Sequence, residues 1–223
     1  MLEVSNPDRV VFPEIGRTKA TSLRTTSGSR RRSPESGTIL TQKFREGRVS
    51  GTIYTIGHGN RTFDELVEAL RTHGIAQLVD VRSFPGSRRN PQFGREQLER
   101  NLPANGIGYV WRKDLGGRRR ARPDSPHTAW RVEGFRAYAD YMDTPAFAAA
   151  LDELLHLAQQ AATAYMCAER LWWQCHRRLL SDALTVRGIA VIHILEAHKS
   201  EQHRPTEFLR VENGRLLYPA HHA

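Results

Sequence analysis

The sequence has very little cysteine, no long apolar run and no secretion signal. Two cysteines in 223 residues are too few for the disulfide framework that organises small secreted domains. Uninterrupted apolar runs are only a few residues long, which is too short to span a bilayer. The N-terminus lacks the basic and then apolar pattern of a secretory signal. These absences exclude a disulfide-stapled secreted protein and a membrane span. They predict a cytoplasmic protein with reduced cysteines and no membrane partner.

Acidic residues are also scarce relative to basic ones. The chain has 33 Lys and Arg against 24 Asp and Glu, which gives a formal net charge of +9 and a pI near 10.1. Between positions 82 and 122, eleven Lys and Arg face only three acidic residues. Such an excess attracts polyanions, so the predicted partner is a nucleic acid or a phosphorylated substrate. The alternative is ordinary solvated charge on loops.

The first fifty residues differ in composition from the rest of the chain. Residues 18–32 are rich in Thr, Ser and Arg and almost devoid of apolar residues, so they have no face to bury and are predicted to be disordered. Residues 5–20, SNPDRVVFPEIGRTKA, resemble the start of the polymerase domain of bacterial DNA ligase D, a double-strand-break repair enzyme. None of that domain's later motifs follows. We predict a disordered or non-native extension over residues 1–50 and a single α/β domain over residues 51–219.

Beyond residue 51, hydrophobic patterning predicts alternating strands and helices. Predicted strands cover residues 52–57, 76–81, 108–111, 164–168 and 189–195. Predicted helices begin near residues 63, 95, 145 and 173, and an Asn-Gly pair at 213–214 predicts a tight turn. This order indicates an α/β fold, with a mainly parallel sheet of about five strands, helices on both faces and a C-terminal β-hairpin. His193, His198 and His203 repeat every five residues, which fits neither helix face nor strand, so we predict that they lie at the surface.

Ligands of parallel sheets bind beyond the carboxyl ends of the strands, and the first candidates follow the first strand. Gly57 and Gly59 allow the backbone to approach a ligand closely, and the N-terminus of the following helix favours an anion. Both glycines are therefore predicted to bind substrate. His58 between them is predicted to be catalytic, as a residue that transfers protons or contacts the substrate. The alternative for His58 is a hydrogen-bonded loop histidine.

The second strand ends in an acidic and a basic residue on the same face. Because side chains alternate along a strand, Asp80 and Arg82 point the same way, where they either form a structural ion pair or frame a substrate together. Asp80 is predicted to be catalytic and Arg82 to bind substrate. The loop over residues 84–93 is basic and carries a phenylalanine at each end, a mixture that holds phosphates and stacks on bases. Within this loop, Ser87 and Arg88 are predicted to bind substrate.

The fourth strand leads into the densest group of reactive side chains, which includes both cysteines. Cys167 and Glu169 are two positions apart at the strand end and point the same way. Cys175, His176 and Arg177 fall in the first turn of the next predicted helix, where the positive helix end and cationic neighbours lower the pKa of a thiol. A carboxylate near these cations can act as a general base. Glu169, Cys175 and His176 are predicted to be catalytic, and Cys167 and Arg177 to bind substrate.

Three sequence blocks, in this order, give the chain a recognisable signature. They are YTIGH at 54–58, DVR at 80–82 with Pro85 and Ser87-Arg88 behind it, and CAE at 167–169 followed by CHR at 175–177. With these blocks, residues 52–218 resemble the family catalogued as domain of unknown function 488. The resemblance implies an α/β fold and nucleic-acid-linked enzymatic action, without naming a reaction. One departure is Leu171-Trp172-Trp173, where the family often has a proline.

Three functions fit these residues. In the first, which we favour, the chain is an enzyme that acts on a base or glycosidic bond of a nucleic acid or nucleotide, linked to DNA repair or modification. Glu169 would then activate water, and no cofactor is needed. In the second, thiol- or metal-dependent chemistry uses Cys167, Cys175 and His176, although their spacing matches neither a redox motif nor a standard zinc pattern. In the third, the chain is a non-enzymatic nucleic-acid-binding module whose cysteines and tryptophans pack in the core.

Overall fold

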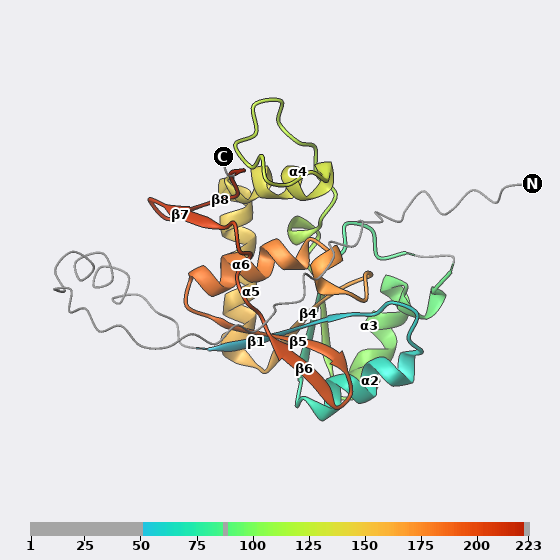
Figure 1. Cartoon of the computed structure of the whole chain (residues 1–223). Coiled ribbons are helices and arrows are strands. Elements are labelled where there is room, and N and C mark those ends of the chain that lie inside the picture. Colours follow the sequence, from blue (N-terminus) through green and yellow to red (C-terminus); the bar gives the residue numbers. More distant parts are fainter. Residues whose placement is uncertain (1–50, 87–88, 221–223) are drawn as a thin grey trace, which may run out of the picture.

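The computed structural model describes residues 51–86 and 89–220 (Figure 1). The predicted N-terminal extension, Ser87 and Arg88, and the last three residues of the chain lie outside the described residues. Within the described part, a six-stranded sheet carries helices on both faces, and a two-stranded hairpin follows near the C-terminus. The predicted α/β class is confirmed.

The sheet has the strand order β3-β2-β4-β1-β5-β6. Its strands are β1 (Thr52–Gly57), β2 (Gln77–Asp80), β3 (Gly108–Trp111), β4 (Thr163–Cys167), β5 (Ala190–Glu196) and β6 (Lys199–Gln202). The first five run parallel to their neighbours, and β6 runs antiparallel to β5. Because β1 and β4 lie at the centre and are covered on both faces, nearly all of their residues are buried instead of alternating between buried and exposed.

Five α-helices lie in the described residues. They are α2 (Phe63–Thr72), α3 (Arg95–Ala104), α4 (Glu133–Met142), α5 (Pro145–Gln160) and α6 (Arg177–Val186). Local sequence sets the starts of two of them: Thr62 and Glu65 form a capping box at α2, and Thr144 caps α5 with Pro145 in the first turn. Short 3-10 turns cover η1 (Pro91–Phe93), η2 (Lys113–Leu115) and η3 (Trp172–Gln174). None of the described helices has the length and apolar character needed to cross a membrane.

The sheet divides the hydrophobic core into two halves, and helices cover each half. On one face, Leu70 of α2 and Leu98 of α3 belong to the same buried cluster as Ile56 of β1. On the other face, Leu180 of α6 belongs to the same cluster as Ile53 of β1, together with residues of α4 and α5. The sheet is therefore buried between two helical layers, as the alternation of strands and helices predicts.

Three local features differ from the sequence prediction or refine it. α4 is an additional helix, and it begins without a side-chain cap. β6 is an additional strand, whose polar sequence pairs through its backbone with β5 at the sheet edge. The helix predicted from residue 173 begins at Arg177, and η3 precedes it. The C-terminal hairpin of β7 (Arg210–Glu212) and β8 (Arg215–Leu217) is confirmed, and the positive φ values of Asn213 (50°) and Gly214 (80°) are those of a type I′ turn.

The prediction that three histidines lie at the surface holds for His198, which is exposed, and is wrong for the other two. His193 and His203 are buried. The period of five failed because the two residues belong to neighbouring segments: His193 lies on β5, and His203 follows β6 and donates its backbone N–H to the carbonyl of Val191. The pairing of two segments, rather than the period of one element, decides which side chains point inward.

These two histidines form a buried chain with an aspartate of α6. Nε2 of His203 lies 2.9 Å from Oδ1 of Asp182, and Nδ1 of His203 lies 2.9 Å from Nε2 of His193. Asp182 also accepts hydrogen bonds from the backbone N–H of Thr206 and the hydroxyl of Tyr218. The segment that follows the sheet is therefore fixed to the middle of α6.

Candidate functional site

Three neighbouring strands bring most of the predicted site residues to one edge of the sheet. β1 ends at Gly57, β2 at Asp80 and β4 at Cys167. Gly57 pairs with Cys167 across β1 and β4, and Asp80 pairs with Met166 across β2 and β4. Because these strands are parallel, their carboxyl ends lie side by side, and the residues that end them are neighbours.

The register also separates these residues into two groups on opposite faces. Asp80 lies beside Met166, which packs in the core half of α2 and α3. Cys167 is the next residue along β4 and points the other way, into the core half of α4, α5 and α6. We call His58, Asp80, Arg82 and Tyr109 the ionic cluster, and Cys167, Cys175 and His176 the sulfur cluster. The predicted residues thus share an edge of the sheet but not a face.

The ionic cluster surrounds a fully buried carboxylate. Oδ1 of Asp80 accepts hydrogen bonds from the backbone N–H of Arg82 at 3.0 Å and from its Nε at 2.8 Å. Oδ2 accepts from Nη2 of Arg82 at 2.5 Å and from the hydroxyl of Tyr109 at 2.7 Å. Burial acts to lower the pKa of Arg82, but the hydrogen bonds and the charge of Asp80 outweigh burial and raise this pKa. The ion pair holds the guanidinium in place at the strand end.

His58 lies beside this ion pair as a neutral imidazole. Its Nδ1 lies 3.0 Å from the carbonyl oxygen of Gly59, and its Nε2 lies 3.3 Å from Nη1 of Arg82. Since a guanidinium only donates, Nε2 is the acceptor and Nδ1 carries the proton. Burial, followed by the charge of Arg82, lowers the pKa of His58 from 6.5 to about 4. His58 is therefore a hydrogen-bonded loop histidine, and its catalytic role stays a prediction.

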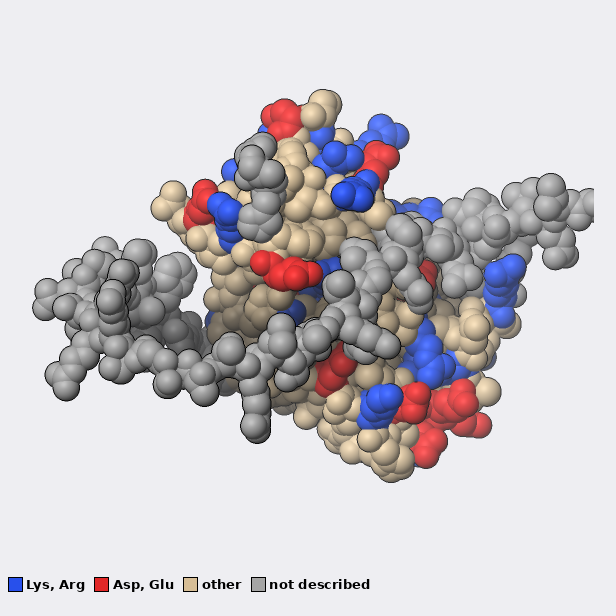
Figure 2. All heavy atoms as spheres, in the orientation of Figure 1, with Lys and Arg blue, Asp and Glu red and all other residues tan. Residues whose placement is uncertain are grey.

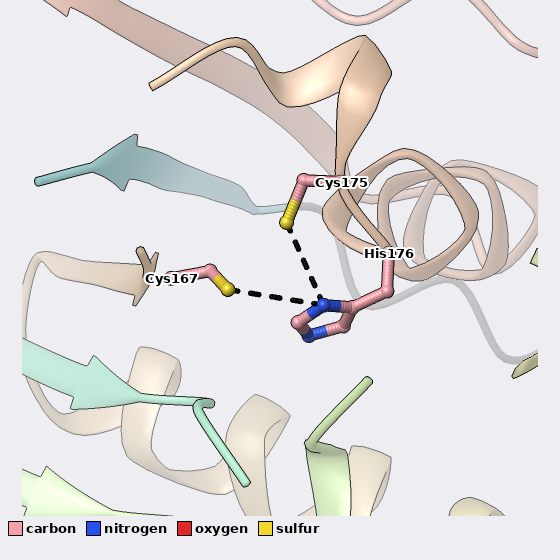
Figure 3. A group of neighbouring side chains, drawn as sticks. All are labelled: Cys167, Cys175 and His176. Atoms are coloured by element: carbon pink, nitrogen blue, oxygen red, sulfur yellow. Dashed lines mark hydrogen bonds between the residues drawn. The ribbon is translucent and has the colours of Figure 1, made fainter. Parts of the chain in front are cut away.

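The sulfur cluster joins the end of β4 to the start of α6 (Figure 3). Sγ of Cys175 lies 3.5 Å from Nδ1 of His176, and Sγ of Cys167 lies 3.8 Å from the same nitrogen. Both cysteines are free thiols, and all three side chains are buried. Within the described residues, this is the group of His, Cys, Asp and Glu side chains that could hold a metal ion, with its ligand atoms within 4.8 Å of one another.

The two thiols of the sulfur cluster differ in acidity. A hydrogen bond with Cys175, followed by burial, raises the pKa of Cys167. Burial also acts to raise the pKa of Cys175, but the hydrogen bond with Cys167 and the neighbouring His176 and Arg177 outweigh it, so this pKa is lowered well below its ordinary value. Of the two cysteines, Cys175 is therefore the one whose surroundings favour the thiolate form. The thiolate is the form that acts as a nucleophile or as a metal ligand.

Arg177 and the two predicted glycines shape this edge of the sheet. Nη2 of Arg177 donates to the carbonyl oxygen of Glu169 at 2.6 Å, and Nη1 donates to Oγ1 of Thr55 at 3.2 Å. At Gly57 a Cβ atom would lie 1.8 Å from the Glu169 carbonyl oxygen, so only glycine fits. Gly59 has a φ of 53°, which also favours glycine. The contacts of these residues with a substrate stay predictions.

Glu169 lies directly beyond β4 at the same edge. Its side chain is half-buried, and its backbone N–H forms a hydrogen bond with the sulfur of Cys167. The backbone of Glu169 therefore lies next to the sulfur cluster, and its carbonyl oxygen accepts a hydrogen bond from Arg177. This position is compatible with the predicted role of Glu169 as a base.

The loop after β2 offers one aromatic ring to solvent. Phe93 was expected to stack on a base together with Phe84, but Phe93 is fully buried and its ring lies against His58, with ring centroids 4.4 Å apart. Phe84 is 65% exposed, and the guanidinium of Arg118 lies 5.4 Å from its ring centroid. The backbone N–H of Arg118 donates to Oγ of Ser83, which joins the loops that follow β2 and β3. Of the two phenylalanines, Phe84 is therefore the one that is open to solvent.

Two residues of the site were absent from the prediction. Tyr109 of β3 pairs with Leu78 of β2, so alternation places it on the same face as Asp80. That signal exists in the sequence, but it becomes readable only when β3 and β2 are known to be neighbours. Gly117, in the loop after β3, packs so closely on His176 that a Cβ atom would lie 2.5 Å from Nδ1. No sequence pattern indicates this contact.

The basic stretch of residues 82–122 is partly neutralised in the folded chain. Among the residues that the structure describes, ion pairs with acidic residues include Arg82–Asp80, Arg95–Glu99, Arg112–Glu153 and Arg122–Asp124. On the face of the molecule that Figure 2 shows, basic and acidic side chains are interspersed. The excess of positive charge is therefore not gathered into one basic patch on this face.

Comparison with known proteins gives a family but no named activity. No curated protein and no solved structure matches the chain. The family described as "Domain of unknown function DUF488" matches residues 62–184, which are more than half of the chain and contain the ends of β2 and β4 and the whole sulfur cluster. This chain therefore belongs to the DUF488 family.

Proposed function

We propose that this chain is an enzyme that acts on a base or a glycosidic bond of a nucleic acid or nucleotide. The observation that carries the proposal is the position of Glu169. Glu169 is half-buried and follows the central strand β4 at the carboxyl edge of a mainly parallel sheet, which is where ligands of such sheets bind. The ionic cluster and the sulfur cluster lie at the same edge, so reactive groups surround this position.

The loops that follow β2 and β3 support the proposed class of substrate. Phe84 is exposed beside Arg118, and an aromatic ring with a guanidinium is the usual platform on which a nucleic-acid base stacks. Arginines of the same loops would contact phosphates, which makes binding strongly dependent on salt. The net charge of +9 also favours the binding of a polyanion.

In this reaction Glu169 would activate water or stabilise developing positive charge on the substrate. Arg82 is oriented by Asp80 and Tyr109 and would hold an anionic group of the substrate near the strand end. His58 already lies against this guanidinium and would accept or return a proton there. No binding energy is needed to order these side chains, because the protein has oriented them before the substrate arrives.

The test is incubation of the full chain with pooled modified and unmodified oligonucleotides and nucleotides, followed by mass spectrometry of the products. Glu169→Gln should lower turnover by about 10²- to 10⁴-fold, the usual contribution of a general acid or base, and should leave binding intact. Glu68→Gln, an exposed glutamate of α2, is the matched control and should keep full turnover. Unchanged turnover in Glu169→Gln would remove this assignment. Binding without turnover by the wild type would favour an accessory nucleic-acid-binding module instead.

A further inference from the structure

The three ligand atoms of the sulfur cluster have the spacing of a metal coordination sphere. Both Cys167 and Cys175 direct Sγ at Nδ1 of His176, at 3.8 and 3.5 Å (Figure 3). A tetrahedral zinc ion with bonds of about 2.3 Å to sulfur and about 2.1 Å to nitrogen separates these two atoms by about 3.6 Å. The two sulfur–nitrogen distances bracket this value. An ion can therefore bind with little movement of the side chains.

The polar groups of the cluster are incompletely satisfied by the protein alone. Both sulfurs compete for one ring nitrogen, Nδ1 of His176, whereas buried polar atoms in proteins are almost always fully paired. A buried cysteine that serves only packing behaves as a small hydrophobic residue and needs no polar partner. This arrangement points to a missing component at the centre of the three atoms.

The chemistry of the three donors selects a thiophilic divalent ion. Two thiolates with an imidazole suit zinc, whereas magnesium and calcium require oxygen ligands. Zinc with two thiolates carries no net charge, so the site stays neutral in a buried position. Binding replaces the thiol protons, which leave to solvent, and His176 binds through Nδ1 as the neutral imidazole with its proton on Nε2.

We propose that Cys167, Cys175 and His176 bind one zinc ion. Three protein ligands leave the fourth tetrahedral position for a water molecule or a substrate atom, as in catalytic rather than structural zinc sites. Glu169 lies two residues beyond Cys167, and its backbone N–H forms a hydrogen bond with the Cys167 sulfur. The zinc site does not rest on the proposed function, because ion binding can be measured without any substrate.

The test uses the full chain, purified under reducing conditions without a histidine tag and then stripped with a chelator. After zinc is added back and the excess removed by dialysis, elemental analysis should give about one zinc per chain, the content of a mononuclear site. Cys167→Ser and Cys175→Ser should each lower the content at least about tenfold, because one of three ligands is lost. His156→Gln changes an exposed histidine of α5 and should retain the full content.

A second measurement on the wild type remains decisive if the cysteine variants do not fold. Cobalt(II) bound at this site should give an intense thiolate-to-cobalt absorption band in the near ultraviolet and the visible bands of a tetrahedral ion, and added zinc should remove both. Three results would each overturn the proposal. They are a zinc content below about one tenth per chain, a cobalt spectrum without the thiolate band, and a disulfide between Cys167 and Cys175 in the anaerobically purified chain.

Discussion

The ionic cluster and the sulfur cluster lie at the same edge of the sheet, on opposite faces, and they differ in how completely the protein satisfies them. In the ionic cluster, both carboxylate oxygens of Asp80 accept two hydrogen bonds each. In the sulfur cluster, two sulfurs share the single nitrogen Nδ1 of His176. A satisfied buried network fixes geometry, whereas an unsatisfied one has capacity for a ligand. The protein alone therefore holds the side chains of the first cluster in a fixed geometry, whereas the second cluster offers ligand atoms to an ion.

The largest expected effect is the loss of stability when the ionic cluster is broken. Asp80→Ala leaves the guanidinium of Arg82 buried without its counter-ion, which should lower the free energy of unfolding by about 3–5 kcal/mol. Urea denaturation measures this change. Asp152→Ala removes an exposed ion pair with Arg187 and should cost less than about 1 kcal/mol. If Asp80→Ala and Asp152→Ala were equally stable, the ion pair of Asp80 and Arg82 would not stabilise the fold as proposed.

His58 of the ionic cluster should also contribute to the pH dependence of stability. His58 has a pKa of about 4 in the folded chain against 6.5 in the unfolded chain, so the unfolded state takes up the proton first as the pH falls. Its contribution, about 3 kcal/mol, is present above pH 6.5 and is lost between pH 6.5 and 4. Denaturation midpoints across this range should fall less steeply for His58→Gln than for the wild type. His156→Gln should keep the wild-type slope, and equal slopes for all three chains would contradict the low pKa of His58.

The smallest expected effect is the loss of a sulfur ligand in metal-free protein. Cys175→Ala removes one small buried side chain, and in the presence of a chelator it should cost about 1 kcal/mol, the typical value for a point mutation. Added zinc should then raise the thermal midpoint of the wild type but not that of Cys175→Ala, because a ligand stabilises only the state that binds it. Asp80→Ala keeps the three sulfur-cluster residues and should still respond to zinc. A thermal shift in Cys175→Ala equal to that of the wild type would place the metal elsewhere.

Much of the fold was readable from the sequence because its signals are local. The strand Thr52–Gly57 and the Asn-Gly hairpin were predicted at or near their observed bounds, since an apolar β-branched run and a two-residue turn each carry their own signature. α4 was missed because Val132 gives it no side-chain cap. β6 was missed because Lys199–Gln202 is polar and forms only through backbone pairing with β5. Such pairing is invisible in the strand's own sequence.

The sequence predicts at which edge of the sheet the candidate site lies, but it does not predict on which face of the sheet each side chain lies. Strand ends located His58, Asp80 and Cys167, because carboxyl ends collect on one side of a parallel sheet. Their division into two clusters depends on register: Asp80 is level with Met166, one residue before Cys167. A shift of one residue reverses the face to which a side chain points. Residue patterns give no register between strands that are far apart in the chain.

One helix connects the sulfur cluster with the far end of the polypeptide. α6 begins next to His176, and its Asp182 receives hydrogen bonds from His203, Thr206 and Tyr218. In a chain shortened before these donors, the Asp182 carboxylate would be buried without partners. The packing of α6 against the sheet would then be weakened. The spacing of Cys167, Cys175 and His176 is thus secured by a C-terminal segment that supplies none of their atoms.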